Sequence, residues 1–119
     1  MKLNKSSRDW SFRIKDILHS IDKIQQYTEN LTASDFKKNE LIIDAVIRNF
    51  EIIGEASNSI PLAVQKGNPD IPWRQMAALR NFLIHEYFGV DVSTVWQTVK
   101  KDLPALKKHL LSFELYPKG

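Results

Sequence analysis

Apolar residues recur every three or four positions along most of this chain, and that spacing constrains the fold more than any other feature. The first segment to show it carries five apolar residues on one face: Trp10, Ile14, Ile17, Ile21 and Ile24. Charged and polar residues fill the opposite face, as expected of an amphipathic helix. The alternation of β-branched and polar residues that marks a strand appears nowhere. The sequence therefore predicts an all-α protein.

Start and stop signals divide the chain into four principal helices and one short helix. The four principal helices are expected at about residues 7–27, 39–60, 72–88 and 92–110. Thr32, with Asp35 three residues later, resembles a capping box and predicts a short helix between the first two. Short connections between these helices favour an antiparallel up-and-down four-helix bundle with this additional short helix.

Proline, glycine and aspartate set the expected boundaries in the second half of the chain. Pro61 is expected to end the second long helix, and residues 65–70, which contain Gly, Asn and Pro, are expected to form a loop. Gly89 should stop the third helix, and Asp91 should cap the last one. Pro104 is expected to kink that last helix rather than end it.

Composition limits the class of protein. With 119 residues, no Cys and a net charge of +3, the chain is expected to form one domain over residues 1–119 without disulfides. No apolar run approaches the roughly 18 residues needed to span a bilayer, so we expect no membrane association and a cytoplasmic location. The small positive charge favours a polyanionic partner only slightly.

Polar and ionisable groups interrupt the apolar pattern of the third helix, among them Arg80, Asn81, His85 and Tyr87. At about 100° per residue, Asn81 and His85 share one face of a continuous helix, while Arg80 and Tyr87 share a neighbouring face. Burying an unpaired guanidinium or imidazole costs several kcal/mol. These groups are therefore expected in a groove or an interface rather than in the core.

The spacing Arg80-x4-His85-x-Tyr87 resembles the Arg-x4-His-x-Tyr motif of the HepT toxins, a family of HEPN-domain proteins. Flanking segments are similar too, and together they cover the chain from about Asp9 to Leu111. These segments are residues 44–56, 71–73, 87–91 and 102–104. The resemblance implies a HEPN-like helical bundle that acts as a metal-independent RNase toxin. It also implies a homodimer with the active groove at the two-fold interface, and a nucleotidyltransferase antitoxin, MntA, encoded beside the toxin.

The residues suit that chemistry without a cofactor. RNA supplies its own nucleophile in the 2′-OH, so cleavage needs a base, an acid and positive charge at phosphorus. His85 is expected to be the base, because an imidazole titrates near pH 6.5, and the partner protomer would supply a second His85. Arg80 offers a forked donor to phosphate, and Asn81 a supporting hydrogen bond.

Tyr87 is a poor base at neutral pH, but its hydroxyl can donate to phosphate and can be modified. The resemblance implies that the antitoxin AMPylates this tyrosine. An anionic nucleotide there would lie over Arg80 and His85 and block RNA. The rest of the sequence offers no metal site, since His85-Glu86 lacks the second His that a zinc-protease helix would need at position 89.

Simpler roles remain open for each residue. Arg80 can form a structural salt bridge to Glu51 or Glu55, His85 can be a satisfied interfacial histidine, and Tyr87 can pack with its hydroxyl at a rim. The whole motif can instead be a contact surface. The chain would then be a non-catalytic helical module that binds a minimal nucleotidyltransferase or its nucleotide substrate.

Three further features have weaker functional expectations. Asn49 falls on an apolar helix face, where an amide needs a partner, and is a candidate to brace the groove. The lysine pairs at 37–38, 100–101 and 107–108 are expected to be scattered surface charge rather than an RNA track. Trp73, Phe82 and Phe88 give the third helix a wide apolar girth, which is a hint of a self-interface.

Overall fold

The computed structural model describes residues 2–82 and 91–115. Throughout these residues the regular structure is helical, and no strand occurs among them. The predicted all-α class is confirmed. His85, Tyr87 and Phe88 lie outside the described residues, as does the expected stop at Gly89.

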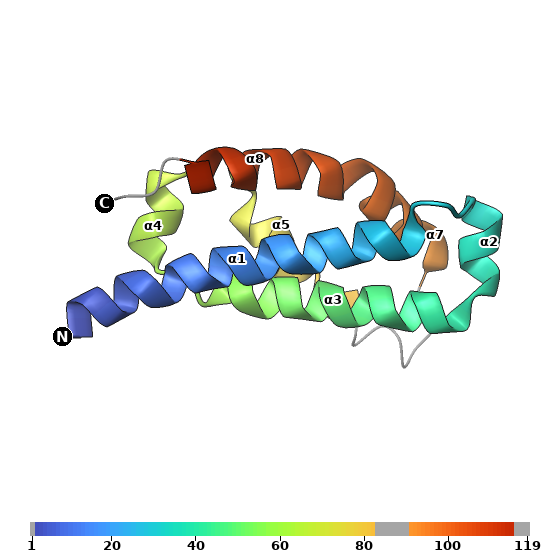
Figure 1. Cartoon of the computed structure of the whole chain (residues 1–119), viewed down its shortest axis with the longest axis horizontal. Coiled ribbons are helices and arrows are strands. Elements are labelled where there is room, and N and C mark those ends of the chain that lie inside the picture. The colour runs from blue at the N-terminus through green and yellow to red at the C-terminus, as the bar shows by residue number, and fades with distance from the viewer. Residues whose placement is uncertain (1, 83–90, 116–119) are drawn as a thin grey trace.

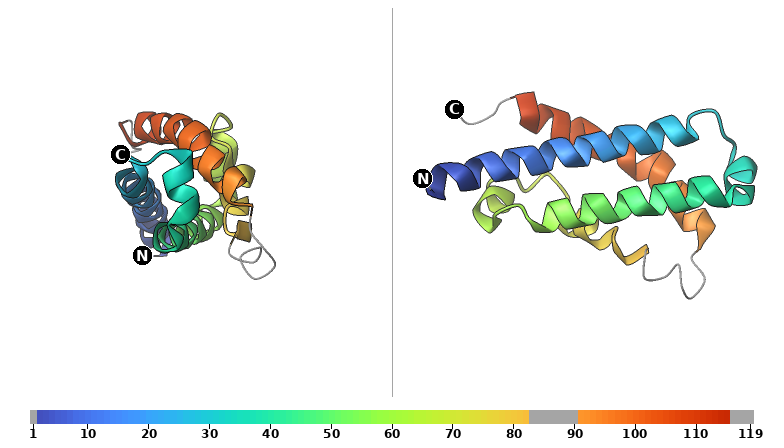
Figure 2. Two further views of the ribbon diagram at one scale, coloured as in Figure 1. Left: turned by 90° about the vertical axis from the view of Figure 1, so that its right-hand side faces the viewer. Right: turned by 60° about the horizontal axis from the view of Figure 1, so that its bottom comes forward.

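The chain forms a bundle of helices (Figure 1). The elements in order are α1 (Lys2–Thr28), α2 (Ala33–Lys38), α3 (Glu40–Asn58), α4 (Leu62–Gly67), α5 (Trp73–Ala78), α7 (Val92–Gln97), the π-helix η1 (Thr98–Asp102) and α8 (Leu103–Leu115). The helices α1 and α3 lie side by side and antiparallel. The helix α8 also packs against α1 and runs in the same direction as α3 (Figures 1 and 2). The short helix α2 closes one end of the bundle.

The core follows the predicted periodicity. The isoleucines of α1, from Ile14 to Ile24, are almost completely buried and pack against α3. The buried face of α3 includes Val46, Phe50 and Ile53. Burial of such side chains stabilises a domain by about 1.5–3 kcal/mol each, so this seam is the main support of the fold.

Side-chain caps begin the helices where the sequence places them. The Thr32 hydroxyl accepts from the Asp35 backbone N–H at 3.0 Å, and the Asp35 carboxylate accepts from the Thr32 N–H at 3.0 Å. These bonds complete the predicted capping box. The Asp91 carboxylate accepts from the Thr94 hydroxyl at 2.8 Å and from the Ser93 N–H at 3.0 Å. The hydrogen bonds from Thr94 are the main reason why the pKa of Asp91 lies below its ordinary value.

The connection after α3 differs from the prediction. The helix α3 already ends at Asn58, with Ser59 as its C-cap, and Pro61 is the N-cap residue of α4. The predicted loop over residues 65–70 is therefore wrong in its first half, because α4 runs to Gly67. Proline explains the difference, since its missing N–H and fixed φ suit the start of a helix as well as the end of one.

The third helix is interrupted, which corrects the expectation of one continuous helix over residues 72–88. It begins at Trp73, next to Pro72 as predicted, but α5 ends at Ala78 and a turn occupies Leu79 and Arg80. At this turn the backbone bonds shorten to the i−3 pattern: Leu79 N–H donates to Met76 O at 3.1 Å, and Phe82 N–H donates to Leu79 O at 3.2 Å. Tightened bonding of this kind is typical of the end of a helix.

The last helical run continues through Pro104, as predicted, but with a change of helix type. Pro104 has no N–H to donate to the carbonyl four residues earlier. Just before it, η1 has π-helical bonding, and Leu103 N–H donates to Thr98 O. The local widening accommodates the missing donor without ending the run.

None of the described helices is both long enough and apolar enough to cross a bilayer.

Replacing Phe36 with Ala tests the closed end of the bundle. Phe36 is fully buried in α2, and its ring centroid lies 5.1 Å from that of Trp96. The Phe36→Ala change leaves a cavity and is expected to lower the free energy of unfolding by about 3–5 kcal/mol, measured by urea denaturation. Phe12→Ala is the matched control, because Phe12 is 55% exposed, and it should change that free energy by less than about 0.5 kcal/mol. Equal losses in the two variants would contradict the packing described.

A second variant tests the cap of α7. Because the folded-state pKa of Asp91 is lowered, its carboxylate stabilises the fold above the unfolded-state pKa near 3.9, and this contribution is lost as the pH falls through the folded-state pKa. Asn is also a good N-cap but does not titrate. Thermal midpoints at pH 7 and pH 3 should therefore fall less for Asp91→Asn than for the wild type. An equal fall would show that the cap does not depend on the charge.

Candidate functional site

Arg80 lies in the turn that follows α5, and Asn81 begins the helical residues after it. Both are exposed in the structure. The predicted pairing of Arg80 with Tyr87 on one helix face involves Tyr87, which lies outside the described residues. Of the four predicted site residues, the described structure therefore contains Arg80 and Asn81 as chain neighbours, while His85 and Tyr87 lie outside it.

The backbone at Arg80 is held close to α3 by a glycine. A Cβ built on Gly54 would lie 2.9 Å from the Arg80 Cβ and 3.0 Å from both the Arg80 N and the Ala77 O. Real Cβ atoms essentially never come within 3.0 Å of such a neighbour. Figure 2 shows α5 alongside α3 where this contact occurs. Only a residue without a side chain at position 54 allows the turn to pack this closely.

The guanidinium of Arg80 is held by the next residue of α3. Arg80 Nη1 donates to Glu55 Oε2 at 3.1 Å, and the two side chains are 44% and 62% exposed. Of the two structural partners that the sequence left open for Arg80, the structure selects Glu55. Glu51 instead accepts from Arg48 at 2.7 Å, one turn earlier on the same helix. The contact with Glu55 engages one of the five N–H donors of a guanidinium, which is a fork suited to phosphate.

The sequence did not predict that Gly54 and Glu55 act together on Arg80. A glycine inside an otherwise regular helix pattern is a signal of close backbone approach. That signal, with an acidic neighbour, could have identified this part of α3. It could not have identified α5 as the element that approaches, because sequence spacing does not show which helices are in contact.

Asn49 has no described contact with Arg80. Its side-chain amide donates to Ala45 O at 2.9 Å within α3, and its side-chain oxygen is buried without a hydrogen-bond partner. Five residues of helix separate Asn49 from Gly54, which places them about 140° apart around α3. The residue therefore lies on a different side of α3 from the contact with α5, so the described contacts do not support a bracing role.

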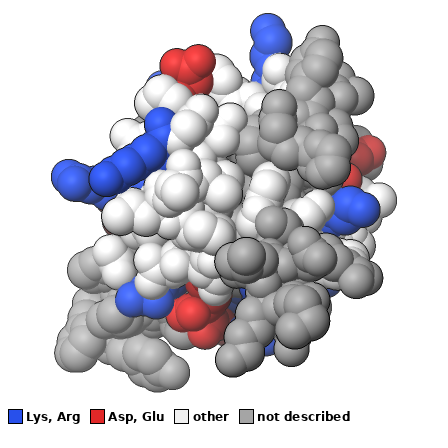
Figure 3. All heavy atoms as spheres, turned by 90° about the vertical axis from the view of Figure 1, so that its left-hand side faces the viewer, with Lys and Arg blue, Asp and Glu red and all other residues white. Residues whose placement is uncertain are grey.

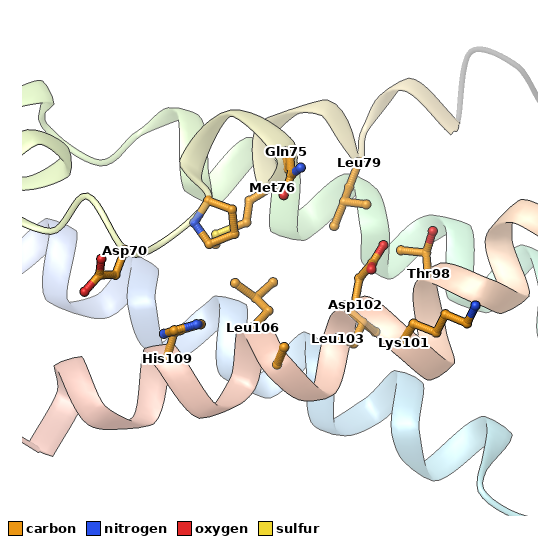
Figure 4. Close-up of a pocket in the computed structure, with 12 residues that line it drawn as sticks. Asp70, Gln75, Met76, Leu79, Thr98, Lys101, Asp102, Leu103, Leu106 and His109 are labelled. Atoms are coloured by element: carbon orange, nitrogen blue, oxygen red, sulfur yellow. The ribbon is translucent and has the colours of Figure 1, made fainter.

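A hollow of about 380 Å³ lies between α5 and the run from η1 to α8 (Figure 4). Its apolar lining comes from Met76, Leu79, Leu103 and Leu106, and charged groups such as Asp102 and Lys101 stand beside them. The residues of α5 and its two caps that line the hollow share one face, at 72, 75, 76 and 79. Arg80, with Ala77, lies on the neighbouring face that contacts α3. The hollow is therefore separate from the surroundings of Arg80.

The lysine pairs contribute partly to the fold. Lys100 Nζ donates to the carbonyl of Thr28 at 3.2 Å and lies 4.7 Å from the ring centroid of Trp96. Lys107 pairs with Asp22 at 2.8 Å. Figure 3 shows the other end of the bundle, away from α2 and α7, where the visible Lys and Arg side chains lie in several separate places. These observations favour the prediction that the pairs do not form one RNA track.

The apolar girth of the third helix is partly covered by the chain itself. Trp73 is only 8% exposed, and its indole N–H donates to Asn68 O at 3.0 Å. The Phe82 ring lies 5.3 Å from that of Phe50. Trp73 is therefore not part of an exposed apolar surface that could form a self-interface.

Two histidines outside the motif belong to the described structure. His19 and His109 are exposed. Within residues 2–82 and 91–115, no cluster of three or more His, Asp or Glu side chains is arranged to hold a metal ion.

Comparison with known proteins gives one consistent family. The family described as "Ribonuclease HepT-like" matches residues 17–113. "Probable ribonuclease HepT" of Thermococcus cleftensis is 45% identical over 105 residues, which cover 88% of this chain and 93% of the relative. "Putative RNase MJ1380" of Methanocaldococcus jannaschii is 42% identical over 105 residues, covering 88% and 96%. No solved structure matches the chain.

A further relative from Methanocaldococcus jannaschii is longer. "Gamma-glutamylcyclotransferase and putative RNase MJ0434" is 42% identical over 104 residues, which cover 87% of this chain. The match spans 47% of that relative, about half its length.

The exposure of the Arg80–Glu55 pair predicts a small effect on stability. Exposed ion pairs contribute about 0–1 kcal/mol, since water and salt screen them and two side chains must be ordered. A double-mutant cycle with Glu55→Ala and Arg80→Ala, measured by urea denaturation, should therefore give a coupling free energy below about 1 kcal/mol. A coupling of 2 kcal/mol or more would show that this pair is part of the structural framework.

Proposed function

Because the chain belongs to the HepT-like ribonuclease family, we propose that it is an endoribonuclease and the toxin component of a toxin–antitoxin pair. The family match over residues 17–113 confirms the resemblance read from the motif. One structural observation supports the proposal more than any other. The motif arginine, Arg80, is exposed in a turn with its guanidinium on Glu55 at 3.1 Å, and within the described residues no other partner of this guanidinium is found, which leaves donors for a phosphate.

The proposed reaction uses the 2′-hydroxyl of the RNA as nucleophile. His85 of one protomer accepts the 2′-hydroxyl proton, and the 2′-oxygen bonds to phosphorus while the bond from phosphorus to the 5′-oxygen breaks. A protonated His85 of the partner subunit gives its proton to the leaving 5′-oxygen. The products carry a 2′,3′-cyclic phosphate and a 5′-hydroxyl. No metal is required, because the nucleophile belongs to the substrate.

Arg80 and Asn81 are assigned to the phosphate. As the 2′-oxygen attacks, negative charge grows on the non-bridging oxygens, and a guanidinium placed there stabilises the transition state more than the ground state. Asn81, the exposed neighbour of Arg80, can hydrogen-bond the same phosphate or the imidazole. The need for two His85 side chains is the chemical reason why we propose a homodimer.

Tyr87 is the proposed point of control. A nucleotidyltransferase antitoxin of the MntA type would catalyse attack of the Tyr87 hydroxyl oxygen on the α-phosphorus of ATP, with release of pyrophosphate. The attached AMP would bring a bulky anionic group into the groove. It would exclude RNA by occlusion and by repulsion of phosphate.

The central test is expression of the chain alone, as wild type and as His85→Ala, followed by growth and RNA integrity. The wild type should inhibit growth and degrade RNA. With the purified proteins, loss of a positioned proton-transfer group should lower kcat by about 10²–10⁴-fold. Cleavage by the wild type should continue in EDTA and stop when the scissile nucleotide is 2′-deoxy. His19→Ala, which changes an exposed histidine outside the motif, is the matched control and should behave as wild type.

Two outcomes would contradict the proposal. Undiminished cleavage by His85→Ala, free of contaminating nuclease, would remove the mechanism. Absence of cleavage by the wild type, together with binding of the nucleotidyltransferase that depends on Arg80 and Tyr87, would instead identify a non-catalytic interaction module.

A further inference from the structure

Two consecutive residues of α3 hold opposite ends of the same arginine. Gly54 lies against the backbone and Cβ of Arg80, where an added side chain would come within 2.9 Å. Glu55 accepts a hydrogen bond from Nη1 of that arginine at 3.1 Å. The first contact fixes the position of the Arg80 Cβ, and the second fixes the position of its guanidinium.

Neither residue adds much to the stability of α3 itself. Gly in the middle of a helix weakens it, because glycine loses more conformational freedom on folding than any other residue. The ion pair is largely exposed, with side chains 44% and 62% accessible, and pairs of that kind contribute little to folding. The same helix carries an exposed pair one turn earlier, Arg48 with Glu51, which has no such glycine contact in the described structure.

We propose that Gly54 and Glu55 are positioning residues that preorganise Arg80 for the phosphate of the RNA. The inference rests on the proposed function, in which Arg80 touches the phosphate. An unrestrained arginine side chain samples many rotamers, and holding both ends removes this freedom before substrate binds. Preorganised charge is what electrostatic catalysis requires.

The carboxylate of Glu55 also has an opposing effect on the substrate. It carries a negative charge beside a group that binds phosphate, so it repels the RNA backbone while it orients the guanidinium. A positioning role therefore predicts different effects of this carboxylate on kcat and on KM. Removing the carboxylate should lower kcat because Arg80 is misplaced, and should leave KM unchanged or lower it because repulsion is gone.

The test compares Glu55→Ala, Glu55→Gln and Glu51→Ala as purified full-length proteins cleaving a labelled single-stranded oligoribonucleotide. Glu55→Ala is expected to lower kcat by up to about 5-fold, the factor that corresponds to the expected coupling of about 1 kcal/mol, without raising KM. Glu55→Gln should retain part of the activity, since its amide oxygen still accepts from Arg80. Glu51→Ala is the matched control on the same helix and should retain wild-type kcat.

A second pair of variants tests the backbone contact. Gly54→Ala should lower kcat by at least about 10-fold, because its Cβ must displace the turn that carries Arg80. Gly67→Ala is the matched control, since a Cβ there would meet nothing within 4 Å, and it should retain wild-type kcat. If Gly54→Ala does not fold, as judged by its thermal transition, the Glu55 variants decide the question.

Arg80→Ala separates failure of this inference from failure of the proposed function. If Arg80→Ala is inactive while Glu55→Ala keeps wild-type kcat, the positioning role is overturned and the nuclease assignment stands. A Glu55→Ala protein with raised KM and unchanged kcat would also overturn it, since that pattern indicates a direct contact with RNA. If Arg80→Ala cleaves as wild type, both the role of Arg80 and this inference are wrong.

Discussion

The close approach of α5 to α3 at Gly54 is the constraint on which the described part of the site depends. It places the turn at Arg80 against α3, within reach of the Glu55 carboxylate at 3.1 Å. The approach requires a rigid α3, and α3 is rigid because one face is buried against the isoleucines of α1. The buried core thus holds α3 in place, α3 holds the turn at Arg80, and the turn places the guanidinium beside Glu55. The proposed role of Arg80 depends on the packing through this sequence of contacts.

Much of the fold could be predicted because its signals are local. The isoleucine spacing of α1, the capping box at Thr32 and the cap at Asp91 each depend on residues within a few positions of one another. The helix α4 and the break after Ala78 were missed for a different reason. Pro61 can end one helix or begin another, and the turn at Leu79 and Arg80 forms where α5 packs on α3, which no local pattern records.

The candidate site was also predicted only in part from the sequence. The sequence placed Arg80 and Asn81 in a groove or an interface rather than in the core, and in the structure both are exposed. It left the partner of Arg80 open between Glu51 and Glu55, because both lie on the charged side of α3. Packing decided between them, since Glu55 adjoins the glycine that contacts the turn. The roles of His85 and Tyr87 stay predictions from the sequence and the family.

The most direct measurement of the central claim, that Arg80 is a positioned phosphate ligand, is the salt dependence of RNA affinity. A 2′-O-methyl oligoribonucleotide lacks the attacking hydroxyl, so binding is measured without cleavage. Each phosphate contact on a single strand contributes about 0.7 to the slope of log affinity against log salt concentration. Arg80→Gln is expected to bind more weakly than the wild type, with a slope smaller by about 0.7. Equal affinities and equal slopes would contradict the account.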